Sequence, residues 1–283
     1  MVDHPSNSED YTARLLFGPR NSSVESKIVI KYCAENPSAQ TALDIFKGCW
    51  KSALAPELGL VTGSKEGFHN DSRVHWVASL FPRQFQGMEV LELGPFEGYD
   101  SYLLEQLGAA KVISIEGNNI NFLKCLVLKD ALGLKTSFLH GGFLQYLKNT
   151  DRRFDLVWAS GVLYHSEDPI ELLEQIGRKT DRLYLWTHYY SDENVNRFLK
   201  EKNVEQSWGG DTYLLHYRSY GLDQFKNGVP LHYEGGQQSF SFWMARADID
   251  RVLQRIGFGS IKLHSEGKLS NGFPFVSLFA ERV

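Results

Sequence analysis

The sequence predicts an α/β fold with a mostly parallel sheet and helices on both faces. Between residues 89 and 187, short apolar runs alternate with helical patterns, and this alternation is typical of successive parallel strands. Near the end of the chain, Asn271-Gly272 separates apolar runs at 260–265 and 274–281. Because Asn-Gly between two strand patterns is a strong hairpin signal, we expect the last strand to run antiparallel to its neighbours. The pattern gives seven strands in all.

Each element follows from the local pattern. The five strands of the alternating region are predicted at 89–93, 111–116, 136–140, 154–159 and 182–187. The helices between them are predicted at 98–108, 118–132, 143–149 and 168–178. A further helix is expected from Ala247 to Ile256, where Gly257 ends it. Upstream, helical spacing covers 24–34, 39–54 and 71–81, with a glycine-containing loop at 58–70 and Asp71 or Ser72 as the last helix's N-cap.

Two regions fall outside the alternation. Residues 1–85 begin with a polar stretch of about 20 residues that we expect to be poorly ordered, and then form a helical cap. Residues 86–283 form the main domain, which contains an aromatic, glycine- and histidine-rich insertion at 189–243. A connection this long inside a compact domain is usually functional, so we expect the insertion to cover a substrate.

The most informative segment is VLELGPFEGYDS at 90–101, where the first strand ends. An acidic residue, Glu92, is followed by a turn with Gly94 and Gly98. The spacing E-x-G-x-x-x-G differs from the G-x-G-x-x-G of dinucleotide sites, and the lysine of a P-loop is missing. Glu97 would place a negative charge beside any phosphate, so the turn favours a cationic nucleoside without phosphates. A loop that only links strand to helix is the alternative.

This segment resembles the first motif of the class I S-adenosylmethionine-dependent methyltransferases, in which the turn wraps the methionine part of the cofactor. A second acidic residue supports the resemblance. Glu116 ends the second strand, where doubly wound folds place a carboxylate that binds both ribose hydroxyls. Glu116 as a cap of the following helix, which begins at Gly117-Asn118, is a compatible alternative. The implied fold is Rossmann-like, with seven strands of which the last is antiparallel.

The resemblance implies S-adenosyl-L-methionine as the cofactor and a set of residues that contact it. These are Glu92, Gly94, Pro95, Phe96, Gly98, Glu116, Gly117, Asn118, Gly142, Phe143, Ser160 and Gly161. The chain departs from the family after the third strand, where an acidic residue often contacts the adenine amino group and this chain has Gly142. Backbone groups at that point could still meet the adenine, with the ring of Phe143 beside it or buried in the core.

Candidate catalytic residues lie at the ends of the fourth and fifth strands. The turn at 161–165, GVLYH, is similar to that of small-molecule methyltransferases and of the wobble-uridine tRNA carboxymethyl-transfer enzymes. It suggests that His165 orients a substrate or acts as a base, although a capping histidine fits equally. His188 and Tyr189 end the fifth strand, where ligands bind in open sheets, and His188 could accept a proton near neutral pH. Packing under the insertion is the alternative for both.

Composition limits the partners. The net charge of −4 and a balanced N-terminal region argue against a nucleic-acid partner, and the slightly acidic insertion argues against a polyanionic acceptor. We expect no metal site, because His188, His216 and His232 lack tight ligand spacing. A polar start, no long apolar run and three scattered cysteines favour a cytoplasmic protein without a membrane span.

These observations predict a methyltransferase that acts on oxygen or nitrogen of a small molecule or glycan. Three alternatives stay open: an enzyme that modifies the wobble uridine of tRNA, a non-catalytic module that binds S-adenosylmethionine, and a dehydrogenase. The glycine spacing disfavours the dehydrogenase. The sequence does not decide whether the protein forms a homodimer.

Overall fold

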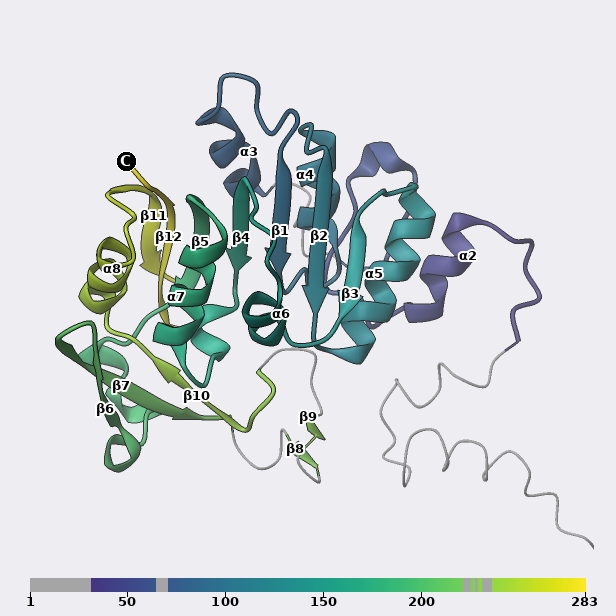
Figure 1. Ribbon diagram of the computed structural model, residues 1–283. Helices are drawn as coiled ribbons and strands as arrows, with labels where there is room; N and C mark the ends of the chain where they lie inside the picture. The colour runs from purple at the N-terminus through teal and green to yellow at the C-terminus, as the bar shows by residue number, and fades with distance from the viewer. Residues whose placement is uncertain (1–31, 65–70, 221–224, 227–228, 231–235) are drawn as a thin grey trace, which may run out of the picture. The chain divides into compact units, whose positions relative to one another are not determined.

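The computed structural model describes residues 32–64, 71–220, 225–226, 229–230 and 236–283 (Figure 1). The chain divides into two compact units, one of residues 1–70 with 130–132 and a larger one of the remaining residues. The division at residue 70 places helix α3 (Ser72–Ser79) in the larger unit, whereas the sequence-based boundary lies at residue 85. The role of the smaller unit as a cap stays a prediction.

The smaller unit contains less helix than its sequence predicts. Helix α2 (Ala39–Leu43) begins at Ser38, whose hydroxyl and backbone form a capping box with Thr41. A 3-10 turn at Asp44–Phe46 follows, and the predicted helix over 39–54 is wrong beyond it. Gly48 takes a φ of +83°, which a helix does not allow. A second 3-10 turn covers Pro56–Leu58. The predicted helix at 24–34 lies outside the described residues except for 32–34, which are not helical.

The larger unit is built on a seven-stranded sheet in the order β11-β12-β5-β4-β1-β2-β3. Its strands are β1 (Glu89–Leu93), β2 (Lys111–Glu116), β3 (Ser137–His140), β4 (Leu156–Ser160), β5 (Arg182–His188), β11 (Ser260–Lys268) and β12 (Pro274–Glu281). The first five are mutually parallel, and β12 pairs antiparallel with both β5 and β11. The predicted fold class is therefore confirmed, including the antiparallel last strand.

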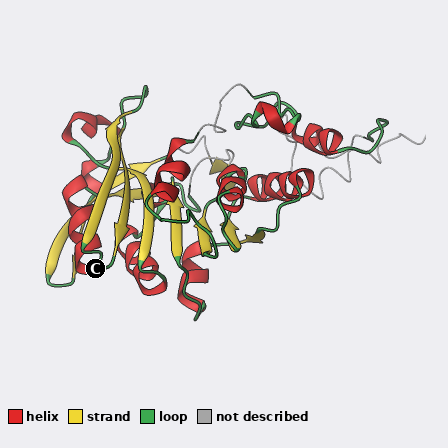
Figure 2. Ribbon diagram, turned by 90° about the horizontal axis from the view of Figure 1, so that it is seen from above, coloured by secondary structure: helices red, strands yellow, loops and turns green. Residues whose placement is uncertain are grey.

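Helices of the larger unit cover both faces of this sheet (Figure 2). They are α3, α4 (Tyr99–Gln106), α5 (Asn119–Leu132), α6 (Phe143–Asn149), α7 (Pro169–Lys179) and α8 (Arg246–Arg255). Helix α7 packs beside α6 and α8, while α3 packs beside α4. Helix α7 begins where Asp168 caps the backbone N–H of Glu171 and Pro169 occupies the first helical position.

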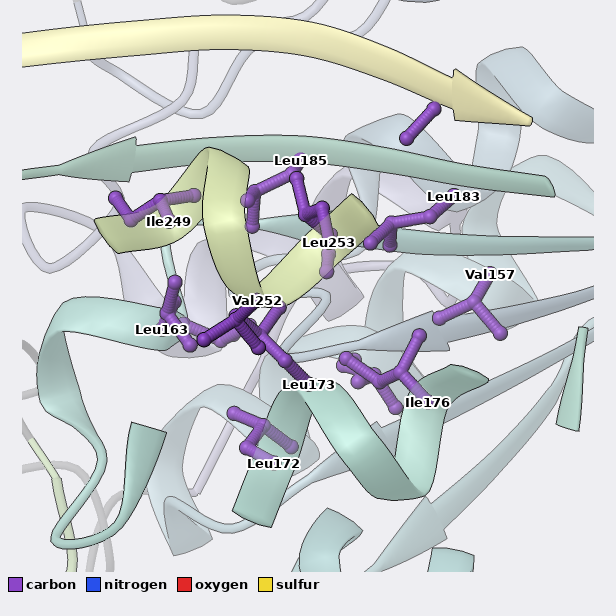
Figure 3. Packing of buried hydrophobic residues seen from close by; sticks show 14 of the residues in the cluster. Val157, Leu163, Leu172, Leu173, Ile176, Leu183, Leu185, Ile249, Val252 and Leu253 are labelled. Carbon is purple, nitrogen blue, oxygen red and sulfur yellow. The ribbon is translucent and has the colours of Figure 1, made fainter. Parts of the chain in front are cut away.

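The main core lies between the sheet and the pair α7 and α8 (Figure 3). Leu173 and Ile176 of α7, together with Val252 and Leu253 of α8, point toward the strands and are at most 1% exposed. Leu185 of β5 meets them from the sheet. Burial of each such side chain stabilises the fold by about 1.5–3 kcal/mol, so this layer holds the strand ends in fixed positions.

The insertion forms a small sheet of its own, which sequence periodicity did not predict. Strand β7 (Asp211–Ser219) lies between β6 (Val204–Trp208) and β10 (Phe240–Trp243), and all pairs are antiparallel. A two-stranded ladder joins β8 (Phe225–Lys226) to β9 (Val229–Pro230). The Phe242 N–H donates to the Ser166 carbonyl over 3.0 Å, which ties β10 to the turn that follows β4. In the described part of the chain, no helix has both the length and the apolar character that a membrane crossing requires.

Candidate active site

The carboxyl ends of β1, β2, β4 and β5 meet along one edge of the sheet. Registers across the sheet align Leu93 with Ile115 and Ala159, and Ser160 with Trp186. Open α/β sheets bind ligands at this edge, where loops leave the strands in different directions. The residues predicted to bind a cofactor or to act in catalysis lie in the last residues of these strands or in the loops and helix starts that follow them and β3.

The turn after β1 depends on left-handed backbone conformations. Gly94 has φ +66° and Gly98 φ +84°, and Phe96 takes φ +58°, which is uncommon for a residue with a side chain. The Gly94 N–H donates to the Ile115 carbonyl over 2.9 Å, so the turn continues the β1–β2 ladder. A Cβ atom on Gly94 would lie 2.6 Å from Cγ1 of Val162, so no side chain fits there. Such strain at a strand end is typical of ligand sites.

Glu116 connects the end of β2 to this turn. Its Oε2 atom accepts a hydrogen bond from the Phe96 N–H over 3.0 Å, and Oε1 accepts one from the Asn118 N–H over 2.8 Å. Burial raises the pKa of Glu116 to about 7, although these backbone N–H groups oppose the shift. The carboxylate is 7% exposed, so a ligand hydroxyl at the strand edge could compete for its remaining lone pairs.

Glu92 lies deeper than the turn and bonds to the protein itself. Its Oε2 atom accepts hydrogen bonds from the hydroxyl groups of Ser101 on α4 and Ser114 on β2, the latter over 2.5 Å. Burial raises the pKa of Glu92 to about 8, and the nearby Asp100 carboxylate adds to the effect. These bonds fix α4 against β2, so the side chain supports the turn from below. Its predicted contact with a cofactor stays a prediction.

Glu97 does not present its charge to the turn. Its carboxylate forms a 2.8 Å ion pair with Lys124 of α5, and both side chains are 1% exposed. Removing one member of a fully buried pair typically costs about 3–5 kcal/mol, because the other charge is left without a counter-ion. The pair therefore ties the turn to α5 without adding net charge at the strand edge.

The loops after β2 and β3 lie beside each other. The Gly141 N–H donates to the Glu116 carbonyl over 3.0 Å, and the Asn118 side chain caps α5 by accepting from the N–H groups of Ile120 and Asn121. Gly142 is the N-cap of α6, and the following Phe143 is partly buried against the main core. These placements keep the backbone of Gly117 and Gly142 at the strand edge, as the predicted adenine contact requires.

The insertion returns to this edge at Gly236 and Gln237. A Cβ atom on Gly142 would lie 2.9 Å from the Gln237 side-chain nitrogen, and one on Gly236 would lie 2.4 Å from the His165 carbonyl oxygen. One short segment thus touches both the loop after β3 and the turn after β4. No sequence pattern indicated this contact.

Arg73 of α3 is a residue at the edge that sequence reasoning did not single out. Its Nη1 atom donates to Ser160 Oγ over 3.0 Å, and its guanidinium carbon lies 5.8 Å from the Trp186 ring centroid. Asp71, the α3 N-cap, accepts from the Arg73 Nε atom over 2.7 Å. Gly161, next to Ser160, has φ +79° and donates its N–H to the Trp186 carbonyl. A fixed cation therefore stands beside the two predicted contacts of β4.

His188 lies in a cluster of aromatic rings at the end of β5. Its ring stacks on Trp243 with centroids 5.3 Å apart and meets Tyr164 edge to face at 4.7 Å. The Nδ1 atom lies 2.8 Å from the Pro274 carbonyl. Because a carbonyl only accepts, Nδ1 carries the proton and Nε2 keeps its lone pair. Burial lowers the pKa of His188, which keeps the ring neutral and able to accept a proton.

His165 lies beside this cluster but bonds to the insertion. Its Nδ1 atom is 2.6 Å from the Tyr220 hydroxyl, which also lies 2.9 Å from Ser241 Oγ. Burial lowers the pKa of His165 to about 3, with the charges of Arg218 and His188 adding to the effect. Such a neutral ring suits a hydrogen bond that holds the insertion in place, and the catalytic role predicted for His165 stays a prediction.

Tyr189 is not brought together with the two histidines. Its hydroxyl donates to Glu266 of β11 over 2.9 Å, whereas His188 faces the aromatic cluster. Tyr189 is the first residue after β5, and its bond to β11 holds it apart from the cluster. Its predicted catalytic role stays a prediction.

The histidines considered as metal ligands are not brought together. His216 stacks on Tyr190 with ring centroids 3.3 Å apart, and His232 lies outside the described residues. Among the residues that the structure describes, no group of three metal-ligating side chains is close enough for an ion.

A family model described as a methyltransferase domain matches residues 70–261, which include every strand end of the site. The chain belongs to this methyltransferase family. The family that the glycine turn and Glu116 predicted is thereby confirmed.

The curated relatives of this methyltransferase are tRNA U34 carboxymethyltransferases. The protein from Campylobacter lari is 23% identical over 129 residues, which are 44% of this chain and 44% of that relative. The protein from Campylobacter hominis is 30% identical over 91 residues, which are 32% of each. The chain thus matches less than half the length of these relatives.

Solved structures share the fold of this methyltransferase. The N-terminal domain of EvdMO1, crystallised in the presence of SAH and D-fucose, has a TM-score of 0.63 at 21% identity. The match covers 87% of this chain and 95% of that one. TehB from Haemophilus influenzae has a TM-score of 0.50 at 15% identity, over 86% of this chain and 67% of that one.

Proposed function

We propose that the protein transfers a methyl group from S-adenosylmethionine to an oxygen or nitrogen atom of a small molecule or a glycan. Membership of the methyltransferase family is the general ground. The single observation that carries the proposal is the pairing of two features at one sheet edge. Glu116 of β2 bonds to the strained turn at Phe96, and at the end of β5, three strands away from β2 in the sheet, His188 keeps a free Nε2 lone pair within an aromatic cluster.

The residues at the edge fit this cofactor. Gly94 leaves no room for a side chain and exposes backbone at the turn, which suits the methionine part. Glu116 stands where ribose hydroxyls could donate to a carboxylate, and the Gly142 backbone lies beyond it for the adenine. The buried pair of Glu97 and Lys124 adds no net charge at the turn, so this pair supplies no free cation for a phosphate group.

When bound, the cofactor supplies a sulfonium methyl group, which is an electrophile for an in-line nucleophile. The protein's own residues do the remaining work. Tyr164, Trp243 and Phe273 pack around the His188 ring, and alignment of two reactants beside such rings can contribute about 7–11 kcal/mol. His188 Nε2 accepts the proton of an acceptor hydroxyl, while the Pro274 carbonyl holds the ring in the tautomer that this step needs.

The aromatic rings around His188 bear on the nature of the acceptor. EvdMO1, the structural neighbour, was crystallised in the presence of D-fucose, and a ring of aromatic side chains suits the apolar faces of a sugar. The acceptor is therefore proposed to be a small molecule of sugar-like size or a sugar unit of a glycan.

Calorimetric titration with S-adenosylmethionine, S-adenosylhomocysteine and NAD tests the cofactor. We expect micromolar binding of the two sulfur nucleosides and no binding of NAD. Binding of NAD alone would overturn the proposal. If neither sulfur nucleoside binds, the chain retains the fold without this chemistry.

A second candidate is modification of the tRNA wobble uridine, which the names of the curated relatives favour. The net charge of −4 argues against it, because tRNA binding requires a basic surface. A salt-dependent gel shift with unmodified tRNA would support this candidate, and its absence at low salt would remove it.

A further inference from the structure

A cation without a carboxylate partner lies in the aromatic cluster beside His188. Arg218 of β7 places its guanidinium carbon 4.8 Å from the Trp243 ring centroid and 4.4 Å from that of Phe273. Within the described ranges, no carboxylate of the protein forms an ion pair with it, and its charged neighbour is a second arginine. Arginine is usually paired when it is this well covered, so the missing counter-charge requires an explanation.

The second arginine adds to the same positive field. Arg197 places its guanidinium carbon 4.2 Å from the centroid of the same Phe273 ring. Burial lowers the pKa of Arg218, and the charge of Arg197 lowers it further, so the two cations repel each other across this ring. The arrangement is costly unless an anion joins it.

A hydrogen-bond donor without an acceptor lies in the same place. The Trp243 Nε1–H is buried, in a residue that is 1% exposed, and finds no hydrogen-bond partner among the residues that the structure describes. A buried donor without an acceptor is destabilising, because it has lost its hydrogen bonds to water. Arg218 packs against the same indole ring that carries this unused N–H. An anionic or strongly polar oxygen would be a suitable partner for the Arg218 guanidinium and for the Trp243 N–H alike.

We propose that Arg218, with Arg197 beside it, forms an anion subsite, and that the methyl acceptor carries a carboxylate or phosphate group which binds there. The inference rests on the proposed function, since this cluster is the acceptor pocket only if the cofactor occupies the neighbouring strand edge. The slightly acidic insertion still disfavours a polyanion. One anionic group is enough to pair with both guanidinium groups, because guanidinium binds carboxylate or phosphate oxygens in bidentate fashion.

The subsite is tested by comparing how acidic and neutral sugars bind to the protein saturated with S-adenosylhomocysteine. The probes are D-glucuronate, D-glucose 6-phosphate and neutral D-glucose, and affinity is measured by calorimetry in the intact chain. Arg218→Met retains an unbranched apolar side chain against the rings but removes the charge. The matched control is Arg251→Met, because Arg251 lies 4.7 Å from the Tyr213 ring but is already paired with Asp248.

We expect at least one acidic probe to bind the wild type at least tenfold more tightly than D-glucose. The acid that binds distinguishes a carboxylate from a phosphate subsite. Arg218→Met should remove this preference, and Arg251→Met should retain it. Equal binding of acidic and neutral probes, absence of acidic binding, or a preference that survives Arg218→Met would each overturn the inference.

Two further measurements keep the outcome interpretable. If Arg218→Met does not fold, Arg218→Lys replaces it, and a single ammonium group should weaken acidic binding severalfold because it cannot bind in bidentate fashion. Unchanged affinity in that variant would also overturn the inference. Titration of S-adenosylhomocysteine alone separates the two proposals, because its failure to bind contradicts the proposed function and its normal binding leaves that function intact.

Discussion

The carboxylate of Glu116 accepts a hydrogen bond from the Phe96 backbone N–H over 3.0 Å. This bond joins the end of β2 to the strained turn that follows β1, the neighbouring strand, where Phe96 has φ +58°. The same side chain is thus expected to contact the ribose and to maintain the turn that holds the methionine part. Its loss should therefore affect the cofactor in two ways.

Glu116→Ala should weaken S-adenosylhomocysteine binding by at least tenfold, because it removes the ribose contact and frees the Phe96 N–H. Glu116→Gln should retain part of the affinity, since an amide oxygen can still accept one of the two backbone bonds. Calorimetry on both variants checks the prediction, with thermal melting as the control for folding. An affinity equal to that of the wild type in Glu116→Ala would show that the ribose lies elsewhere.

Cofactor affinity should depend on pH through the same residue. Burial raises the pKa of Glu116 to about 7 in the free protein, and hydroxyl donors favour the ionised form, so binding lowers this pKa. Affinity for S-adenosylhomocysteine should then fall as pH decreases below about 7, by up to about tenfold per unit. Titrations at pH 6, 7 and 8 measure the slope. Glu116→Gln is the control, and a slope of the same size in that variant would assign the effect to another group.

Gly94→Ala should destabilise the fold and weaken cofactor binding, because φ is +66° and the new Cβ would lie 2.6 Å from Val162 Cγ1. The matched control is Gly133→Ala, where φ is +65° and nothing lies within 4 Å of the added atom. The strain common to both should cost about 1 kcal/mol or more. Denaturant unfolding should show a larger loss of unfolding free energy for Gly94→Ala than for Gly133→Ala. Adding Val162→Ala to the Gly94→Ala variant should remove the clash and recover that difference. Equal losses at the two glycines would mean that Val162 moves freely.

His188→Asn should lower turnover about 100-fold with little change in S-adenosylhomocysteine affinity. The asparagine amide can still donate to the Pro274 carbonyl, so the variant removes mainly the Nε2 lone pair. Steady-state kinetics with the acceptor found by screening, together with calorimetry, separate the two effects. Wild-type turnover in this variant would exclude His188 as the base and leave it as a wall of the pocket.

Glu92→Gln should make the protein more stable in alkaline solution. Burial raises the pKa of Glu92 from 4.5 to about 8, so the folded state favours the neutral form. That stability is complete below pH 4.5 and is lost as pH rises through 8, with a full effect on the order of 5 kcal/mol. Unfolding by denaturant at pH 5.5, 7 and 8.5 checks it, with Glu205→Gln at an exposed position as the control. A wild type more stable than the variant at pH 8.5 would contradict the raised pKa.

Sequence periodicity predicted the sheet well because local and tertiary preferences agree there. The strand at 89–93 and the helix at 143–149 have the predicted bounds, and Asn271-Gly272 correctly indicated the terminal hairpin. The prediction of a helix over 39–54 was wrong beyond the first turns, because the same apolar spacing is compatible with a chain that folds back on itself. In the structure the Trp50 Nε1–H donates to the Leu43 carbonyl, and that contact requires the chain to leave the helix.

The site was predicted only where strand position alone determines it. Glu116 follows from its place at the end of β2, since any carboxylate there reaches the turn after β1. Arg73 could not be found in this way, because it reaches Ser160 across 87 positions of sequence. Arg218 lies on a strand of the insertion whose pattern was ambiguous, and its importance comes from a missing partner that no local pattern reveals.

The contacts of Gly236 and Gln237 limit how the specificity of this enzyme can change. One piece of chain touches the His165 carbonyl, beside the proposed acceptor site, and the Gly142 loop at the expected adenine site. Replacing the insertion to accommodate a new acceptor would therefore also alter how long the cofactor product is retained. Directed evolution of acceptor choice in this scaffold should proceed through side chains such as Arg218 rather than through exchange of the whole insertion. Exchange of the insertion would change acceptor binding and retention of the cofactor product at the same time.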